Sequence, residues 1–275
     1  MNRSTERNRT DWIARSEAAE GIERIEAFLH GNAYSMHRHD TYAIGVTLAG
    51  VQCFHYRRGL CRSLPGQTMV LHPDEAHDGQ AGTSEGFRYQ MLYVQPAAIQ
   101  AVLGGKALPF VEGGIATDPR LFEATQNALR RMHAHAEPLE RDDALFELAI
   151  ALDAAAGARP AKPSADYAAA QRARDYLQAA CTENVTLDML AAVGGRDRWS
   201  LSRDFRTFYG TSPYRYLTMR RLEAARAMML RGMPLADTAA AAGFSDQSHM
   251  TRHFRSAYGI SPARWLAMMG GPRRG

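Results

Sequence analysis

Ser202-Arg-Asp-Phe-Arg-Thr-Phe-Tyr-Gly-Thr-Ser-Pro-Tyr-Arg-Tyr-Leu217 and Thr251-Arg-His-Phe-Arg-Ser-Ala-Tyr-Gly-Ile-Ser-Pro-Ala-Arg-Trp-Leu266 are two copies of one sequence. At a shift of 49 residues, nine of the sixteen positions are identical: Arg, Phe, Arg, Tyr, Gly, Ser, Pro, Arg and Leu. Self-similarity at a fixed shift indicates a repeated structural unit. The last third of the chain is therefore predicted to contain one helical unit twice.

The residues shared by the copies mark where helices end and begin. Gly210 and Gly259 stand where a helix needs a left-handed residue to stop. Two residues later, Ser212-Pro213 and Ser261-Pro262 supply an N-cap and a first-turn proline. Each copy therefore predicts a helix, a tight break and a second helix.

A shorter helix precedes each copy. Leu187–Val193 and Leu235–Ala242 are short apolar segments that end in a glycine, Gly194 and Gly243. Asp197 and Asp246 then cap the following helix. Helix, glycine-containing turn and helix is the helix-turn-helix arrangement.

A connecting helix from Pro213 to about Arg231 spans roughly 27 Å at 1.5 Å per residue. This length can place two recognition helices about one DNA turn, ~34 Å, apart.

The second helix of each unit separates a buried face from an exposed one. The pairs Leu201 and Phe205, and Met250 and Phe254, have i, i+4 spacing and are predicted core. Arginine, glutamine and serine are side chains that contact bases and phosphates. The expected DNA-binding residues are Arg198, Trp199, Ser202, Arg203, Arg206, Gln247, Ser248, His249, Arg252 and Arg255. Arg203 and Arg252, which repeat near the helix starts, are favoured as DNA contacts, whereas Arg206 and Arg255 fit an exposed helix-face charge equally well.

The charge of the chain is uneven. The segment from Ser164 to Gly275 contains sixteen Arg, no Lys and nine acidic residues, which gives a net charge of +7. The rest of the chain has 17 basic and 20 acidic residues, which gives a net charge of −3. This asymmetry indicates that one end meets a polyanion, although a GC-rich genome would also favour Arg. The polar start predicts no signal peptide. The chain has no apolar run of ~18 residues, which predicts no membrane span. Its three cysteines form no CxxC motif and indicate a reducing cytoplasm.

The first half has the pattern of an all-β domain. Short apolar runs with Gly and Pro breaks, such as Tyr42–Leu48 and Phe87–Val94, predict a β-barrel or sandwich. Residues 1–20 are expected to be a polar lead-in that could include a short helix. Pro119–Met132 and Leu139–Ala156 have helical spacing and predict a hairpin that packs on the barrel or forms a dimer surface.

The repeat resembles the AraC family of bacterial transcription regulators. Ala241–Arg255 followed by Tyr258–Pro262 is similar to the signature of that family, and Arg220–Arg226 resembles its linker helix. Thr238 departs from the family pattern, which usually has an apolar residue there. The resemblance implies sequence-specific binding to double-stranded promoter DNA, and RNA polymerase is a further partner if the protein is an activator.

The N-terminal half is similar to the cupin-like effector-binding domain of the same family. The resemblance involves His37–Tyr42, Leu64–Gly66 with Pro73–Asp78, and Gly86–Val94. It implies a small-molecule effector bound in the barrel and a homodimer. The expected effector-binding residues are His37, His39, Tyr42, His77, Tyr89 and Met91; for Tyr89 and Met91 an ordinary core position is an equal alternative.

The expected architecture is therefore multidomain α and β. A cupin-like β-barrel with a helical hairpin occupies residues 1–156, a Pro- and Ala-containing linker residues 157–166, and an all-α double helix-turn-helix domain residues 167–275. The expected function is that of a cytoplasmic, effector-responsive regulator. A non-specific architectural DNA binder is an alternative that competition with bulk DNA would distinguish.

A metal-dependent cupin enzyme with a DNA-binding tail is the other alternative. His37-x-His39 fits the first half of the cupin metal pattern, and His77 could be a third ligand. Tyr42 and Ala43 stand where that pattern has Glu, and Glu75 replaces a glycine. We therefore expect no metal, no cofactor and no catalytic residues, and interpret these histidines as polar groups at the rim of an organic pocket.

Overall fold

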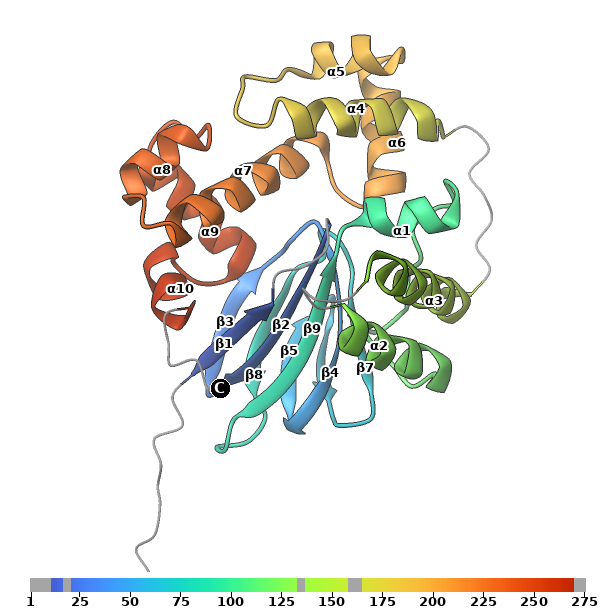
Figure 1. The fold of residues 1–275 in the computed structure, drawn as a ribbon, viewed down its shortest axis with the longest axis vertical. Coiled ribbons are helices and arrows are strands. Elements are labelled where there is room, and N and C mark those ends of the chain that lie inside the picture. The colour runs from blue at the N-terminus through green and yellow to red at the C-terminus, as the bar shows by residue number, and fades with distance from the viewer. Residues whose placement is uncertain (1–10, 17–20, 133–136, 158–164, 270–275) are drawn as a thin grey trace, which may run out of the picture.

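Two antiparallel β-sheets form the first part of the chain (Figure 1). The computed structural model describes residues 11–16, 21–132, 137–157 and 165–269. One sheet has the strand order β1-β2-β9-β4-β7-β10 and the other the order β3-β8-β5-β6, which confirms the predicted barrel-like fold. The strands are β1 (Trp12–Ser16), β2 (Ile22–Leu29), β3 (Asn32–His37), β4 (Tyr42–Gly50), β5 (Gln52–Tyr56), β6 (Gly59–Ser63), β7 (Thr68–Leu71), β8 (His77–Ala81), β9 (Phe87–Val94) and β10 (Ile115–Ala116).

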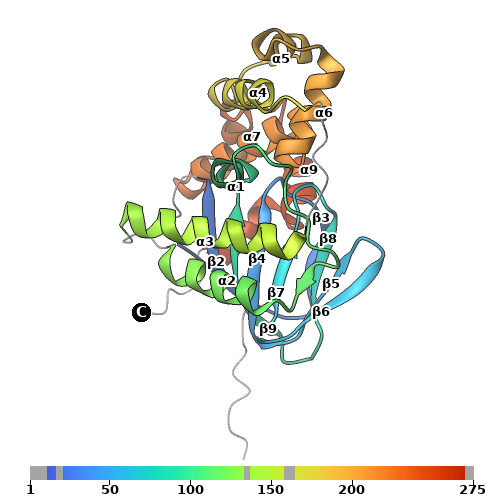
Figure 2. The same ribbon diagram turned by 90° about the vertical axis from the view of Figure 1, so that its right-hand side faces the viewer.

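Three helices cover the outer face of the six-stranded sheet (Figure 2). They are α1 (Pro96–Leu103), α2 (Pro119–Arg131) and α3 (Pro138–Ala156), and the last two form the predicted hairpin. Asp118 caps α2 by accepting a hydrogen bond from the Arg120 amide. Because strand side chains alternate between faces, Leu92 and Val94 of β9 pack under these helices while Tyr89 and Met91 face the barrel interior.

The C-terminal part is all helical and contains the two predicted helix-turn-helix units. Its helices are α4 (Tyr167–Ala179), α5 (Leu187–Gly194), α6 (Arg198–Tyr209), α7 (Pro213–Leu230), α8 (Leu235–Ala241), α9 (Gln247–Tyr258) and α10 (Pro262–Met269). α5 and α6 form the first unit, α8 and α9 form the second, and α7 joins them. Figure 1 shows the two units at opposite ends of α7.

The two units have different relations to the barrel. Met250, Phe254 and Trp265 of the second unit and α10 belong to one hydrophobic core with barrel residues such as Tyr89 and Met91. The first unit instead has its own core, made by α4, α5, α6 and the start of α7. The second unit is therefore docked on the end of the barrel through a continuous apolar interior.

Two local expectations differ from the structure. Trp12–Ser16 form strand β1, paired with β2, so the interpretation of this segment as a polar lead-in is wrong; an edge strand needs only one partly apolar face, and Ile13 of β1 packs against the barrel core. Helix α1 was not predicted because it has only eight residues. Residues 158–164 of the predicted linker lie outside the described residues. Among the described helices, none has the length and apolar character to cross a bilayer.

Candidate DNA-binding surface and effector pocket

Aspartates fix the starts of both recognition helices. The Asp197 carboxylate accepts hydrogen bonds from the amides of Trp199 and Ser200 at the start of α6, and Asp246 accepts one from the amide of His249 at the start of α9. These bonds satisfy amides that a helix N-terminus leaves free. Both predicted caps are confirmed, and they set the first turn of each helix where the basic side chains begin.

Helix α6 has the predicted two faces. Leu201 and Phe205 are fully buried, while Trp199 is 66% exposed although it is a large aromatic residue. Arg198, Arg203 and Arg206 are exposed and Ser202 is half-buried. Arg203 donates a hydrogen bond to Ser200 Oγ at 2.8 Å and Arg206 donates one to the carbonyl of Ser202 at 3.0 Å, so both guanidinium groups lie along the outer face.

Helix α9 repeats this arrangement. Met250 and Phe254 are fully buried in the shared core. Gln247, Ser248, Arg252 and Arg255 are exposed, and with Thr251 they line a shallow groove on the outer surface. His249 is half-buried and its ring lies edge-on to the ring of His253. The described structure therefore places nine of the ten expected DNA-binding side chains fully or partly on an outer helix face, and His249 at the edge of one.

The barrel cavity lies between the β-sheets and the second unit. It has a volume of about 100 Å³. From the barrel it is lined by His37, His39, His77, Tyr89 and Met91, all five of which were expected effector residues. The helical domain contributes Met219, Glu223 and Arg226 of α7 together with Tyr258 and Trp265. The pocket is thus built from both domains, which the sequence did not indicate.

Tyr42 is the one expected effector residue that does not line this cavity, so that prediction is wrong. Its side chain lies on the helix-facing side of β4, in the core with Ile44 and Val46. Its hydroxyl donates a hydrogen bond to the carbonyl of Pro109 at 2.7 Å. The physical reason is strand parity: Ala43, not Tyr42, faces the barrel interior.

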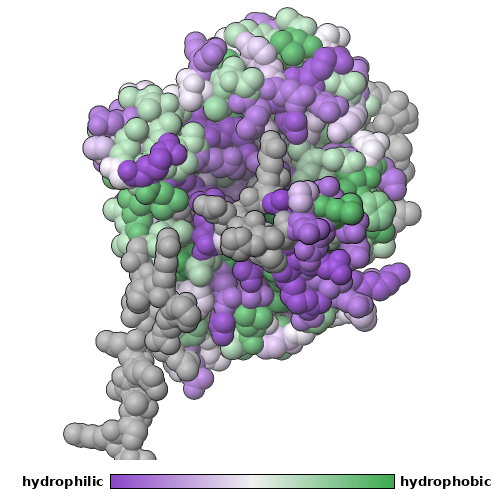
Figure 3. Space-filling view, viewed as in Figure 1, coloured by the Kyte–Doolittle hydropathy of each residue, from purple (hydrophilic) through white to green (hydrophobic). Residues whose placement is uncertain are grey.

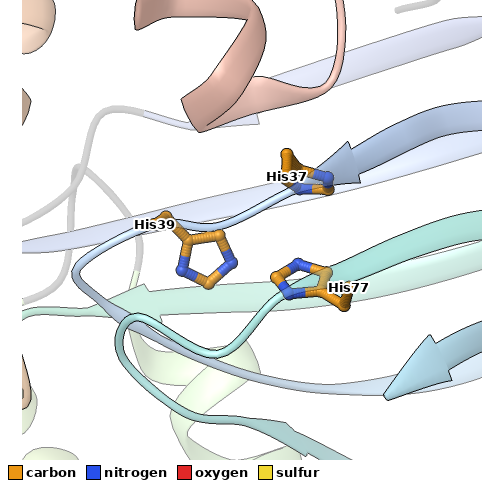
Figure 4. A group of neighbouring side chains, drawn as sticks. All are labelled: His37, His39 and His77. Carbon is orange, nitrogen blue, oxygen red and sulfur yellow. The ribbon is translucent and has the colours of Figure 1, made fainter. Parts of the chain in front are cut away.

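Three histidines meet at the end of the cavity (Figure 4). His37 and His77 are paired across the β3–β8 ladder and their ring centroids are 4.3 Å apart. His39 follows β3, and its ring centroid is 4.8 Å from that of His77. Burial lowers the pKa of His39 to about 3 and that of His77 well below its usual value, and it lowers the pKa of His37 as well. All three rings are therefore uncharged at neutral pH.

Tyrosines form another polar part of the lining. The hydroxyls of Tyr34 and Tyr89 are 2.9 Å apart and share a hydrogen bond. Burial raises the pKa of Tyr34 to about 12 and that of Tyr89 well above its usual value. Both hydroxyls are protonated at neutral pH and can donate hydrogen bonds to a ligand or to each other.

Buried ion pairs join the two domains. Arg220 of α7 and Asp40 are each 2% exposed, and Arg220 Nη2 lies 2.7 Å from Asp40 Oδ2. Arg226 donates two hydrogen bonds to Glu23 of β2, at 2.7 and 3.0 Å. Burial alone would raise the pKa of Glu23, but Arg226 and Arg15 together outweigh it and the pKa is lowered. These residues were not predicted, because their partners are 180 and 203 positions away in the sequence.

Backbone contacts hold the end of α9 against β3. The Arg38 amide donates to the carbonyl of Ser256 at 3.1 Å, and Ser35 Oγ donates to the carbonyl of Gly259 at 2.7 Å. Gly259 has a φ of +69°, and an added Cβ would lie 2.7 Å from the Ser35 oxygen and 3.1 Å from His37 Nδ1. The glycine that ends the second recognition helix is therefore also the point where the barrel touches it.

Comparisons with known proteins agree with this geometry. Residues 21–149 match the AraC-like ligand binding domain and residues 190–268 match a helix-turn-helix domain. The HTH-type transcriptional regulator YbfI of Bacillus subtilis (strain 168) is 23% identical over 234 residues, covering 78% of this chain and 84% of that protein. ToxT from Vibrio cholerae O395 has the same fold, with a TM-score of 0.65 and 11% identity over 92% of this chain and all of that chain.

A second ToxT structure, from strain SCE256 with an unsaturated fatty acid bound, has a TM-score of 0.66 and 11% identity over 94% of this chain and 99% of that chain. The chain belongs to the AraC family of transcription regulators, as the sequence resemblance indicated. It is a DNA-binding regulator with an N-terminal ligand-binding domain and a C-terminal helix-turn-helix domain. The family consists of transcription regulators, not enzymes.

Proposed function

We propose that α6 and α9 bind consecutive major grooves of promoter DNA. The observation that supports this is the paired geometry: two capped helices with outward arginines stand at opposite ends of α7 (Figure 1). The 18 residues of α7 correspond to about 27 Å of helix, close to the ~34 Å repeat of the DNA groove. The connecting helix thus has the length to set the spacing of two recognition helices.

Within this surface, Arg203 and Arg252 are the proposed base-contacting residues. They occupy equivalent places in the two copies, and an arginine can make two parallel hydrogen bonds to guanine. The others position the helices on phosphates, sugars or thymine methyl groups. They are Arg198, Trp199, Ser202, Arg206, Gln247, Ser248, His249 and Arg255.

We also propose that an effector in the barrel cavity controls the docking of the second unit. The cavity of about 100 Å³ is smaller than the ~300–1,000 Å³ typical of ligand pockets. A ligand of that size would fit only if α7, α9 and α10 move outward from the barrel. His37, His39, His77, Tyr89 and Met91 would contact it from the barrel side. ToxT, whose fold is shared, was crystallised with an unsaturated fatty acid, which has the apolar body that this lining suits.

A homodimer formed through α3 completes the proposal. Leu139, Phe146 and Ile150 are 71%, 56% and 45% exposed and follow one another at seven and four residues, so they form one apolar stripe. Apolar side chains gather on the side of the molecule where α1 and α3 lie (Figure 3). A dimer would cover this stripe. In this proposal residues 1–156 are the effector-binding and dimerisation domain, residues 157–166 are the linker and residues 167–275 are the DNA-binding domain. RNA polymerase would be a further partner if the protein is an activator.

Binding of the full-length protein to a promoter fragment from its own genomic neighbourhood tests the proposed DNA contacts. Arg203→Ala and Arg252→Ala should each weaken specific binding by ~1–3 kcal/mol, because each removes a base contact. Arg62→Ala, which removes an exposed arginine from β6 of the barrel, is the matched control and should leave the affinity unchanged.

Two results would contradict these assignments. Specific affinity that is unchanged in both recognition-helix variants would exclude Arg203 and Arg252 as base contacts. A preference of less than ~10³ for the promoter over bulk DNA would favour a non-specific architectural binder instead.

A further inference from the structure

We propose that His37, His39 and His77 form a binding site for a divalent transition-metal ion at the end of the barrel cavity. One ring nitrogen from each lies within 4.8 Å of the others. The histidines come from the end of β3, the segment after it and the start of β8, and Figure 4 shows their rings around a common space. The β3–β8 ladder, in which His37 and His77 are direct partners, fixes the relative position of two of the three.

Backbone hydrogen bonds fix the tautomer of each ring. The Nδ1 atoms of His37, His39 and His77 lie 2.9, 2.9 and 3.0 Å from the carbonyl oxygens of Ser35, Thr41 and Glu75. A carbonyl oxygen only accepts hydrogen bonds, so each Nδ1 carries the proton and each Nε2 presents a lone pair. An imidazole whose other nitrogen donates to a backbone carbonyl is the usual arrangement of a metal-binding histidine.

One of these lone pairs has no partner in the protein. His39 is 4% exposed, and its Nε2 is buried without a hydrogen-bond donor among the described residues. A buried polar atom left in this way costs free energy unless something satisfies it. The ring nitrogens of three uncharged histidines lie close together here, and a cation between them would satisfy the unpartnered one.

The donor set selects the kind of ion. Three neutral imidazoles suit zinc and other late first-row divalent ions, whereas calcium and magnesium require oxygen ligands. Zn–N bonds of about 2.0–2.1 Å in a tetrahedral site set the nitrogens about 3.4 Å apart. The histidine nitrogens are separated by up to 4.8 Å, so the ion would draw the rings inward by rotation about their side-chain bonds.

Three protein ligands leave coordination positions open, and these positions face the cavity. The same cavity is lined by Tyr93, whose ring contacts that of His39 edge-on at 5.3 Å, and by Arg226 of the helical domain. An open position on a three-histidine ion takes water or an exchangeable donor atom. The effector class that this site would bind is a small molecule with an oxygen or nitrogen ligand for the metal and an apolar remainder.

The site also adjoins the contact between the barrel and α9. Ser35, which binds the His37 ring through its carbonyl, also donates to the Gly259 carbonyl, and Arg38 donates to the Ser256 carbonyl. An ion held by His37 and His39 would restrict the segment between them, which includes the Arg38 amide. Metal binding would therefore stabilise the docked second unit. The absence of the cupin glutamate, on which the sequence prediction of no metal rested, does not remove the site, because three histidines suffice.

Direct metal binding to the full-length, tag-free protein tests this site. After removal of metals by a chelator, Zn²⁺ is titrated by calorimetry and bound zinc is counted by mass spectrometry. We expect one ion per chain in the wild type. His39→Ala and His77→Ala should weaken binding by about 100-fold or more, since loss of even an outer-shell partner costs ~10–100-fold. His30→Ala, which removes a histidine paired with Asp11 outside the cluster, is the control.

Thermal unfolding of each variant in the presence of chelator would reveal a folding defect. His37→Ala provides a further ligand variant, at the least buried of the three rings. In the wild type, Zn²⁺ should also slow hydrogen exchange of the Arg38 amide, and in folded His77→Ala it should not. The proposal is overturned if wild-type protein binds no more zinc than a folded ligand variant. It is equally overturned if zinc binds with the same affinity to the wild type and to two ligand variants.

Discussion

Asp40→Asn is expected to loosen the docking of the helical domain without unfolding either domain. Asp40 accepts a hydrogen bond from Arg220 inside the interface, and both residues are almost completely buried. Removal of one partner from a buried ion pair costs about 3–5 kcal/mol because the other charge is left uncompensated. Here Arg220 keeps its contact with Glu223 at 2.7 Å, and the Glu223 side chain is 40% exposed. We therefore expect a smaller effect than that range, about 2–3 kcal/mol.

That loss corresponds to about a 30- to 140-fold shift toward the undocked form, at 1.4 kcal/mol per factor of ten. Separation of the domains lets Arg220 regain water, so the change falls on docking and not on the stability of each domain. The Arg38 amide reports docking directly, since its hydrogen bond to Ser256 crosses the interface. Its hydrogen exchange should accelerate, and promoter affinity should rise because the second unit becomes free to orient on DNA.

Hydrogen exchange with peptide resolution and a promoter-binding titration measure the two effects on the same sample. Glu26→Gln is the matched control, because Glu26 pairs with Arg88 on the barrel surface away from the helical domain. Unchanged exchange at Arg38 in folded Asp40→Asn protein would refute the view that the pair holds the interface closed. Faster exchange with unchanged promoter affinity would refute the link between docking and DNA binding.

Two further predictions concern the dimer and the acid response. Phe146→Glu should convert the dimer to monomers in analytical ultracentrifugation with thermal stability changed by less than ~0.5 kcal/mol, because the side chain is 56% exposed; a persistent dimer would move the interface elsewhere. The native pKa of Glu23 is lowered from its ordinary 4.5, so the stabilisation from its pair with Arg226 is fully present above that pH and is lost as the pH falls through the lowered value. Small-angle scattering should show the domains of the wild type separating as the pH falls below 4.5, whereas Glu23→Gln, which has no carboxylate to protonate, should lack this step; the same step in both proteins would contradict this.

The local features of the helical units could be predicted from the sequence because they depend on neighbouring residues. Asp197 and Asp246 cap helices, and Gly210 and Gly259 end them, through contacts within four residues. Strand parity likewise puts Tyr89 and Met91 on the same face of β9, whereas the family resemblance implied that this face is the interior one. These features need only the chemistry of one residue and the period of its element.

The position of the pocket between two domains could not be predicted in this way. Its helical wall is docked by pairs such as Arg220–Asp40, between residues that no local period connects. Tyr42 shows the complementary error: the family resemblance implied a place at the barrel mouth with His39 and His77, but in β4 it is Ala43 that faces the interior and Tyr42 that faces the helices. Nearness along a strand does not place two side chains on the same face.

The duplicated glycines explain how one barrel can act on both recognition helices. Gly210 and Gly259 both have a φ of +69°, and at both an added Cβ would come within 2.7 Å of a barrel atom, of Pro73 and Ser35 respectively. The duplicated helix stop is thus also a duplicated docking point. The response of the two units still differs, since only the second shares its hydrophobic core with the barrel. Undocking of α9 must expose more apolar surface than undocking of α6, and the cavity lies beneath the second unit. A ligand in that cavity therefore acts directly on the second unit, which is the unit whose undocking costs more free energy.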